Sequence, residues 1–227
     1  MTADQAHPGA APDAAIVLDM WSDVTCPWCY IAKTRLRAAI DGWERPHEVL
    51  LRHRAFELDP GLTERVPVAA YLGRKYGGGD EAGVAMTNRI ASVAASTGLR
   101  IDFTRAVKAN TFDAHRLIAL GLAAGGPAQA EAVLERLFSA HFAEGLAIDD
   151  HTALLRCCAE AGLDERRVAA VLAEDGYADE VRADEEQART LGVTSVPFVI
   201  ANGRAAVSGA QPVEVFTDLL RSAGDPV

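Results

Sequence analysis

The chain has 227 residues, of which 49% are hydrophobic and 24% charged, which suits one elaborated domain or two small ones with a real core. Its formal net charge of −10 argues against a nucleic-acid or anionic-membrane partner. No apolar run approaches the roughly 20 residues that a membrane helix needs. We therefore expect neither nucleic acid nor membrane among the partners.

Residues 1–14 contain no Lys or Arg and no apolar core, unlike a secretory signal. We expect them to form a flexible tail and the protein to be cytoplasmic. In the cytoplasm structural disulfides are uncommon, and a CxxC motif is more often catalytic or metal-binding.

The next part of the chain predicts a β-α-β unit. The apolar run 16–21 suits a buried strand, and helical spacing follows at once. Residues 48–58 alternate, with Arg52 and Arg54 on one face, which favours an edge strand over a central one. The sequence CPWC stands at the turn between the first strand and the helix.

From residue 59 to about 175 the pattern predicts helices only. Pro127 suits the first turn of a helix. Asp149 or Asp150 can cap the next helix, which Gly162 closes. No strand is evident in this section.

Strands return near the C-terminus. Residues 197–201 and 205–209 are joined through Asn202-Gly203, a strong hairpin signal, and Pro212 starts a last helix. The order of elements predicts an α/β thioredoxin-like fold, with a four-stranded mixed sheet and a large all-helical insertion. The predicted parts are a tail (1–14), a thioredoxin-like domain (15–60 and 176–227) and the helical insertion (61–175).

The pair Cys26 and Cys29 is the strongest candidate for chemistry. Cys26 opens a helix, where unpaired N–H groups and the helix dipole favour a thiolate. Such positions lower a cysteine pKa from about 8.5 to roughly 3.5–7.5. Cys29 lies almost one turn further in, shielded but close enough to attack a mixed disulfide on Cys26. Between them, Pro27 stiffens the turn and Trp28 completes the active-site dipeptide.

Other interpretations of the cysteines are weaker. A metal site lacks further ligands at a suitable spacing, and a haem-attachment motif is excluded because Tyr30 follows the second cysteine. Inert packing stays open as an alternative for the CxxC. Cys157 and Cys158 fall on an apolar helix face, which favours a role in the core.

The segment GVTSVPFVI places Pro197 at the start of a strand. A proline is tolerated there on ordinary grounds. The functional interpretation is a cis Val196–Pro197 bond that presents backbone groups to a substrate beside Cys26. The residues alone leave both interpretations open, because cis X-Pro bonds are uncommon.

Several separated motifs resemble the DsbA-type branch of the thioredoxin superfamily, and within it the FrnE-like subgroup. They are SDVTCPWCYIAKTRL, RAFELDPGL, NTFDAHRL, GVTSVPFVI and SGAQPVEVF. The resemblance implies thiol–disulfide oxidoreductase activity and a cis-proline loop of Ser195, Val196 and Pro197 that binds substrate. It implies no bound cofactor beyond a redox-active Cys26–Cys29 disulfide.

Two departures qualify this resemblance. The dipeptide is Pro-Trp where strongly oxidising DsbA proteins have Pro-His, so we expect a pair less oxidising than about −120 mV. Glutathione-dependent relatives, the kappa-class transferases and hydroxychromene-carboxylate isomerases, typically have serine at the position of Cys26 and lack the second cysteine. Their activity, with glutathione as co-substrate, stays the alternative to a disulfide reductase or isomerase. The substrate of the main hypothesis is a disulfide-containing protein or small molecule.

Three more residues are candidates for the site. Asp23 and Glu57 are either buried acids that relay the Cys29 proton or solvated loop carboxylates. His115, in NTFDAHRL, lines a cleft or packs in a helix that Asn110 or Thr111 caps.

Overall fold

The computed structural model describes residues 15–224, so the predicted tail of residues 1–14 lies outside the described residues. Four strands form one mixed sheet in the order β2-β1-β5-β6. Strand β1 pairs in parallel with β2 and antiparallel with β5, and β5 pairs antiparallel with β6. The strands are β1 (Ile16–Ser22), β2 (Val49–Ala55), β5 (Phe198–Ala201) and β6 (Ala205–Ser208). The α/β fold and the edge position of β2 are confirmed.

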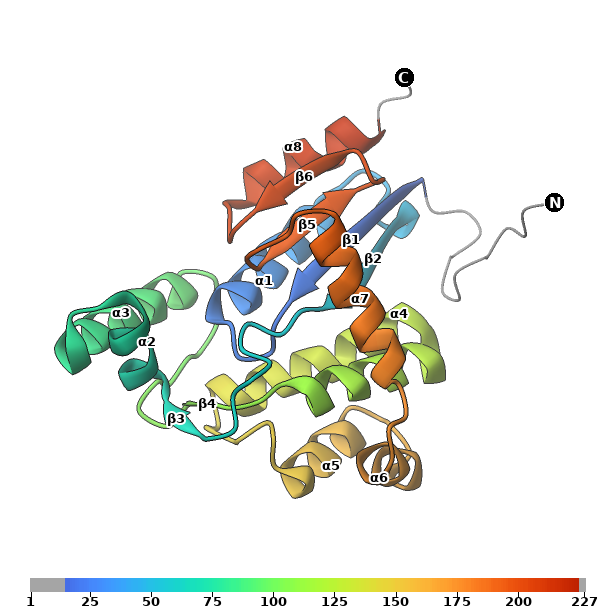
Figure 1. The fold of residues 1–227 in the computed structure, drawn as a ribbon. Coiled ribbons are helices and arrows are strands. Elements are labelled where there is room, and N and C mark those ends of the chain that lie inside the picture. The colour runs from blue at the N-terminus through green and yellow to red at the C-terminus, as the bar shows by residue number, and fades with distance from the viewer. Residues whose placement is uncertain (1–14, 225–227) are drawn as a thin grey trace.

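Helices cover both faces of this sheet (Figure 1). On one face α1 (Pro27–Asp41) and α8 (Val213–Gly224) pack against Leu18 and Met20 of β1. On the other face α7 (Ala178–Thr190) packs against Trp21. Alternate residues of β1 therefore enter two separate cores, as the two-residue period of a strand requires. A short 3₁₀ helix, η1 (Pro46–Glu48), precedes β2.

The predicted hairpin is present between β5 and β6. Asn202 and Gly203 both have positive φ, 48° and 66°, the conformation for which these residue types are suited. The Asn202 side chain also accepts a hydrogen bond from the N–H of Val17 at 2.7 Å, which ties the hairpin to the start of β1.

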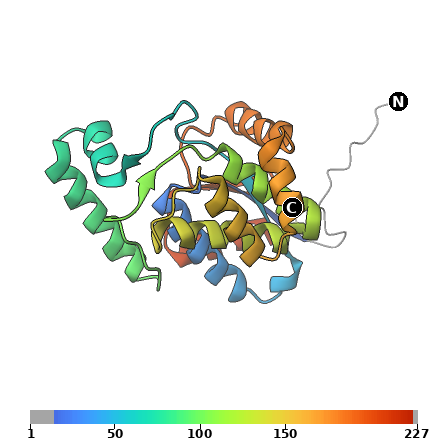
Figure 2. The ribbon, with the colours of Figure 1, turned by 90° about the horizontal axis from the view of Figure 1, so that it is seen from below.

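The helical insertion lies between β2 and α7. Its helices are α2 (Val68–Tyr76), α3 (Gly79–Ala95), α4 (Phe112–Phe142), α5 (His151–Glu160) and α6 (Glu165–Ala173). Both views show α2 and α3 projecting as a pair to one side (Figure 2). The expectation of no strand here is wrong, because β3 (Val66–Pro67) and β4 (Val107–Lys108) form a two-stranded antiparallel ladder. A two-residue strand is too short to show a period in the sequence.

Helix α4 is two helices joined at a kink. Gly125 and Gly126 have non-helical backbone angles, and Pro127 begins the second part, as its predicted place in a first turn requires. By length and composition alone α4 could cross a membrane, so the expectation that no segment reaches this apolarity is wrong. In the fold, however, its apolar side chains pack in the core of the insertion.

Helix α5 begins at an aspartate cap and is followed by a glycine, as the sequence predicts. Of the two candidate aspartates, Asp150 caps α5 by accepting a hydrogen bond from the Ala153 N–H at 2.9 Å. Gly162, with φ of 92°, follows its end. Cys157 and Cys158 are buried on the inner face of α5, which confirms their place in the core.

The core of the insertion continues into the active-site turn. Val24, Cys26, Cys29 and Tyr30 belong to the same cluster of buried side chains as the apolar faces of α4, α5 and α6. The ring of Tyr30 stacks on that of Phe138 in α4, with centroids 4.7 Å apart. The insertion is thus packed directly against the helix that begins at the CPWC sequence.

Candidate active site

Cys26 occupies the N-cap position of α1. Its backbone is extended, and its N–H donates to the carbonyl of Asp23 at 3.0 Å, which closes the turn after β1. Pro27 takes the first helical position, where it lacks only an N–H that would have no partner in the helix. The sequence therefore places Cys26 at the strand-to-helix turn, as predicted.

The surroundings of Cys26 favour its thiolate. The Cys29 thiol donates a hydrogen bond to the Cys26 sulfur and lowers the pKa of Cys26. Burial opposes this effect, and the Cys29 backbone N–H reinforces it, so that the pKa lies below the ordinary value. The same N–H also donates to the Cys26 carbonyl oxygen at 3.0 Å, within the first turn of α1. Cys26 is 5% exposed.

Cys29 has the opposite environment. It is fully buried, and burial raises its pKa well above the ordinary value. Hydrogen bonding to Cys26 and the charge that develops there raise this pKa further. At neutral pH Cys29 is therefore a protonated thiol beside a more acidic partner.

The loop before β5 lies against Cys26. The Val196–Pro197 peptide bond is cis, as the resemblance implied. The Val196 carbonyl oxygen lies 3.8 Å from the Cys26 sulfur, close enough to accept its S–H. Pro197 is buried, Val196 half-buried and Ser195 exposed. The predicted substrate loop is thus beside the predicted nucleophile, although 170 residues separate them in the chain.

Trp28 is the exposed member of the CPWC sequence. It is 36% exposed, whereas Pro27 and both cysteines are buried. An aromatic ring that stays accessible beside a reactive sulfur offers an apolar contact for a substrate.

Asp23 is buried and held ionised. Its carboxylate accepts hydrogen bonds from the N–H groups of Leu58 at 2.7 Å and Thr25 at 3.0 Å. Burial raises the pKa of this carboxyl, but the Lys108 ammonium, the nearby His115 and these hydrogen bonds outweigh it, and the pKa is lowered. A solvated loop carboxylate is therefore the wrong description of Asp23. Its position beside an ammonium favours a fixed charge over a group that binds and releases protons.

Glu57 is buried as well, but its charged neighbours differ from those of Asp23. Its side chain has no exposed surface and pairs with Arg182 at 2.8 Å. Burial raises the pKa of Glu57, the Arg182 contact opposes this, and Glu185 adds to it, which leaves the pKa raised. Of the two candidate relays, Glu57 is thus the one whose affinity for a proton is increased.

Residues of the NTFDAHRL segment have three different structural roles. Asn110 provides the hydrogen bond at the start of α4, accepting from the Phe112 N–H at 2.9 Å, while the Thr111 side chain makes no capping bond. His115 is buried close to Asp23 and lowers the pKa of that carboxyl. It therefore packs beneath the site and does not line a cleft. Arg116 donates to backbone carbonyls that include that of Gly176 and ties α4 to the segment after α6.

Sequence reasoning missed one residue of the site, Lys108. Its ammonium donates to the Thr25 hydroxyl at 2.5 Å and lies 3.7 Å from Asp23. A signal was present, because Lys108 stands alone in the apolar run from Ala106 to Ala109. A charged residue in such a run is buried only when it has a partner.

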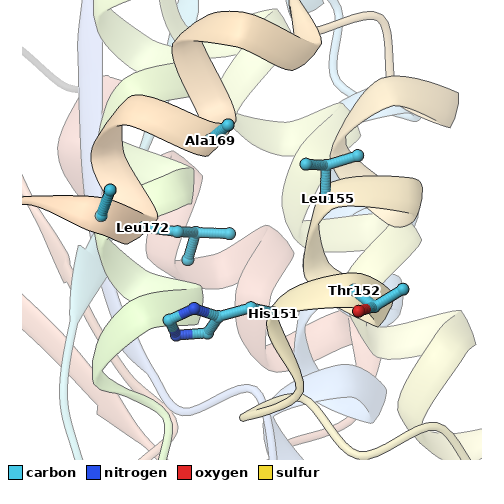
Figure 3. A pocket seen from close by; sticks show the side chains of 6 residues that line it. His151, Thr152, Leu155, Ala169 and Leu172 are labelled. Carbon is cyan, nitrogen blue, oxygen red and sulfur yellow. The ribbon is translucent and has the colours of Figure 1, made fainter.

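Two hollows, of about 330 and 340 Å³, are lined by residues of the insertion, and neither includes Cys26 or Pro197 in its lining. Figure 3 shows the first, a groove that His151, Leu155 and Leu172 line from the facing helices α5 and α6. Within residues 15–224 no three His, Cys, Asp or Glu side chains are placed to hold a metal ion.

Comparisons with known proteins agree with this geometry. The profile of the DSBA-like thioredoxin domain family matches residues 17–221. The crystal structure of a probable DsbA oxidoreductase from Streptomyces coelicolor is similar, with a TM-score of 0.88 and 39% sequence identity. That alignment covers 93% of this chain and 92% of the other. No curated protein sequence matches the chain.

More distant structures share the fold alone. The cytosolic disulfide reductase DsbM from Pseudomonas aeruginosa has a TM-score of 0.64 at 19% identity, covering 91% of this chain and 97% of that one. A 2-hydroxychromene-2-carboxylate isomerase has a TM-score of 0.66 at 17% identity, covering 91% and 93%. Reductase and isomerase chemistry thus occur on the same scaffold, and only the side chains of the site can distinguish them.

Proposed function

The chain belongs to the family of DSBA-like thioredoxin domains, and from this premise we propose that it is a disulfide reductase or isomerase that uses Cys26 as nucleophile and Cys29 as resolving thiol. The FrnE-like subgroup is part of the proposal and rests on the five motifs of the sequence. Its substrate is a disulfide in a protein or a small molecule.

The contrast between the two sulfurs is the observation that supports this assignment. Cys26 has a lowered pKa and retains some exposure, whereas Cys29 has a raised pKa and none. A thiolate attacks a disulfide and a thiol does not. The first attack therefore belongs to Cys26, and Cys29 acts only after Cys26 has formed a bond.

The reaction proceeds in two exchanges. The Cys26 thiolate attacks one sulfur of the substrate disulfide, which forms a mixed disulfide and releases the other sulfur as a thiolate. Cys29 then loses its proton and attacks the Cys26 sulfur. This second exchange forms the Cys26–Cys29 disulfide and releases the fully reduced substrate, so two electrons pass from the protein to the substrate. Two external thiols must return these two electrons and themselves become a disulfide, and glutathione is one candidate.

The substrate lies across the turn and the loop before β5. Trp28 and Ser195 are exposed there, and the Val196 carbonyl is directed at the reactive sulfur. An extended substrate segment can pair with such a backbone group and place its disulfide in line with Cys26. We propose that the apolar face of the helical insertion contributes to the choice of substrate.

The direction of electron flow depends on the compartment. We propose that the protein works in the cytoplasm, where the glutathione pool is reducing. In that setting net reduction or isomerisation of disulfides is favoured over net oxidation. The Pro-Trp dipeptide agrees with this direction, because it places no additional positive charge beside the Cys26 thiolate.

The experiment compares cysteine variants in insulin reduction. Cys26→Ser is expected to abolish turnover, and Cys29→Ser is expected to accumulate mixed disulfides that a reductant releases. Cys157→Ser is the matched control, because this buried cysteine lies in α5 and outside the CPWC turn. Full activity of the Cys26→Ser variant would refute the proposal.

The same variants test the glutathione-dependent alternative. An isomerase or transferase that acts on small aromatic compounds needs no resolving thiol, so its turnover would survive the loss of Cys29. Glutathione-dependent turnover of such a compound by Cys29→Ser, without insulin reduction by the unmodified protein, would favour the alternative.

A further inference from the structure

Lys108 is a buried lysine that the exchange steps above do not use. It lies on β4, within the insertion, and is 4% exposed. Its Nζ donates to the Thr25 hydroxyl at 2.5 Å and lies 3.7 Å from an Asp23 carboxylate oxygen. Because an ammonium is costly to remove from water, its burial needs compensating contacts, of which an anion is the strongest.

Asp23 is that anion. It is fully buried, and within the described residues Lys108 is the one cation at ion-pair distance from its carboxylate. The hydroxyl of Thr25 bridges the two charges, since it also lies 3.2 Å from Asp23 Oδ1. The lysine, the threonine and the aspartate thus form one connected group of polar side chains.

This group lies directly behind the reactive sulfur. Thr25 precedes Cys26, whose N–H donates to the Asp23 carbonyl at 3.0 Å. The Asp23 carboxylate alone opposes a second negative charge on Cys26 and raises its pKa, whereas the Lys108 ammonium lowers it. The charge that the sulfur experiences therefore depends on the presence of both partners.

The insertion fixes the lysine in this place. Strand β4 pairs with β3, with Val66 opposite Lys108, and the N–H of Val68 donates to the carbonyl of Ala106 at 3.3 Å. The ring of Tyr71 in α2 lies 5.6 Å from the Lys108 Nζ. These contacts hold the side chain between α2 and the active-site turn.

We propose that Lys108 is a positioning residue of the thiol–disulfide exchange. Through this lysine the helical insertion places a positive charge beside Asp23 and Thr25. That charge balances the buried carboxylate behind Cys26. The inference rests on the proposed function for its role in the reaction. It assigns to the insertion a part in the electrostatics of the site, in addition to any contact with substrate.

The test measures the pH dependence of Cys26 alkylation by iodoacetamide, with the modified peptide identified by mass spectrometry. The variants are Asp23→Asn, Lys108→Met and the double variant, each checked for native circular dichroism. Lys108→Met alone is ambiguous, because the buried carboxyl can take up a proton when its partner is lost. The decisive comparison is therefore between Asp23→Asn and the double variant, in which no carboxylate is present to compensate.

The expected order of midpoints follows from the charges. Asp23→Asn removes the carboxylate that raises the Cys26 pKa, while the Thr25 hydroxyl and the Tyr71 ring still contact the Lys108 ammonium, so its midpoint lies below that of the unmodified protein. In the double variant the midpoint rises by about one pH unit relative to Asp23→Asn, and alkylation below both midpoints slows about tenfold. The other titratable groups nearby are the same in both variants: Cys29, Glu57, His115, His141 and Glu185.

Lys75→Met is the matched control. Lys75 also lies over the Tyr71 ring, 5.4 Å from its centroid, but on the exposed side, where its Nζ donates to the Tyr71 hydroxyl. Its loss is expected to leave the midpoint unchanged. Coincident midpoints for Asp23→Asn and the double variant, or an equal shift in Lys75→Met, would overturn the inference.

The two proposals fail differently in this experiment. If Cys26 of the unmodified protein reacts only at the pH of an ordinary thiol, about 8.5, the proposed function fails whatever the order of the variants. If it reacts at lower pH while Asp23→Asn and the double variant coincide, only the role of Lys108 is overturned.

Discussion

Only two residues separate Cys26 from Cys29, yet their positions at the start of α1 make them chemically different. Cys26 precedes the helix and receives hydrogen bonds from the turn that follows it. Cys29 lies inside the helix, sealed by the core of the insertion. Position relative to the start of α1, together with the hydrogen bond between the two thiols, therefore separates nucleophile from resolving thiol.

The residue between them that faces solvent, Trp28, sets our first prediction. Trp28→His introduces an imidazole that can carry a positive charge next to Cys26 and stabilise its thiolate. A more stable thiolate favours the reduced form, so the reduction potential is expected to rise by about 30 mV for each unit by which the Cys26 pKa falls. Equilibration with glutathione buffers measures this potential.

Trp28→Phe is the control for loss of the indole, because it changes the ring without adding a charge, and it is expected to leave the potential nearly unchanged. The unmodified protein is expected to be less oxidising than about −120 mV. A value at or above that figure would contradict the charge argument for the Pro-Trp dipeptide.

At this scale the sequence predicts residues whose signal is local. Cys26, Cys29 and Pro197 stand in short motifs at the ends of recognisable elements, and the structure brings them together. Lys108 is joined to Asp23 by a contact between residues far apart in the chain. Whether an acid is buried and paired or solvated depends on such contacts between distant segments, which the spacing of residues in the sequence does not reveal.

Among the elements, β2 is packed between helices of both parts of the molecule. Its residue His53 lies near Lys33 and Arg37 of α1 and Glu131 of α4, and both of its ring nitrogens are buried without a hydrogen bond. Burial lowers the pKa of His53 to about 4; Glu131 opposes this, and the two cations add to it. The ring is therefore neutral in the fold at pH 7.

This gives a prediction for stability against pH. The unfolded chain binds a proton at His53 below pH of about 6.5, whereas the folded chain does not until about 4, so stability is lost as the pH falls through this window. Replacing His53 by Leu removes that loss. The free energy of unfolding of His53→Leu, relative to the unmodified protein, is expected to improve by about 2 kcal/mol between pH 7 and pH 5.

Urea unfolding at the two pH values measures the difference. His47→Leu is the matched control, because the His47 side chain is 78% exposed and its removal should not change the pH dependence. An identical pH dependence in His53→Leu and the unmodified protein would show that His53 is not held neutral by the packing of β2.

The elements differ in how far the sequence predicts them. The Asn202-Gly203 hairpin and a cap of α5 at Asp149 or Asp150 follow from local conformational preference, and the sequence predicts both. The β3–β4 ladder was not, because two strands of two residues each are defined by pairing across about 40 residues of chain and by no local pattern. Tertiary packing, rather than sequence period, creates such elements.

For the whole molecule, the central feature is a core that both predicted domains share. The cluster around Cys26 and Tyr30 is continuous with the apolar faces of α4, α5 and α6. Ion pairs add to it, since Lys33 of α1 lies 2.7 Å from Glu135 and 3.4 Å from Glu131 of α4. We therefore expect the thioredoxin-like part and the insertion to unfold as one cooperative unit.

Two spectroscopic probes separate the parts. All three tryptophans, Trp21, Trp28 and Trp43, lie in the thioredoxin-like part, whereas most of the helices that dominate circular dichroism lie in the insertion. Denaturant transitions followed by tryptophan fluorescence and by circular dichroism are expected to coincide. Two separate midpoints would show that the insertion is an independent folding unit and that the shared core contributes little to stability.

The ionisation of the two active-site sulfurs in the unmodified, reduced protein tests the account most directly. Ultraviolet absorbance of the thiolate, followed against pH and compared with the Cys26→Ser variant, measures it. We predict that one thiolate, absent from the variant, forms well below the ordinary thiol pKa of about 8.5, while Cys29 stays protonated above that value. A Cys26 that titrates at or above about 8.5, or a Cys29 that ionises first, would contradict the assignment of nucleophile and resolving thiol.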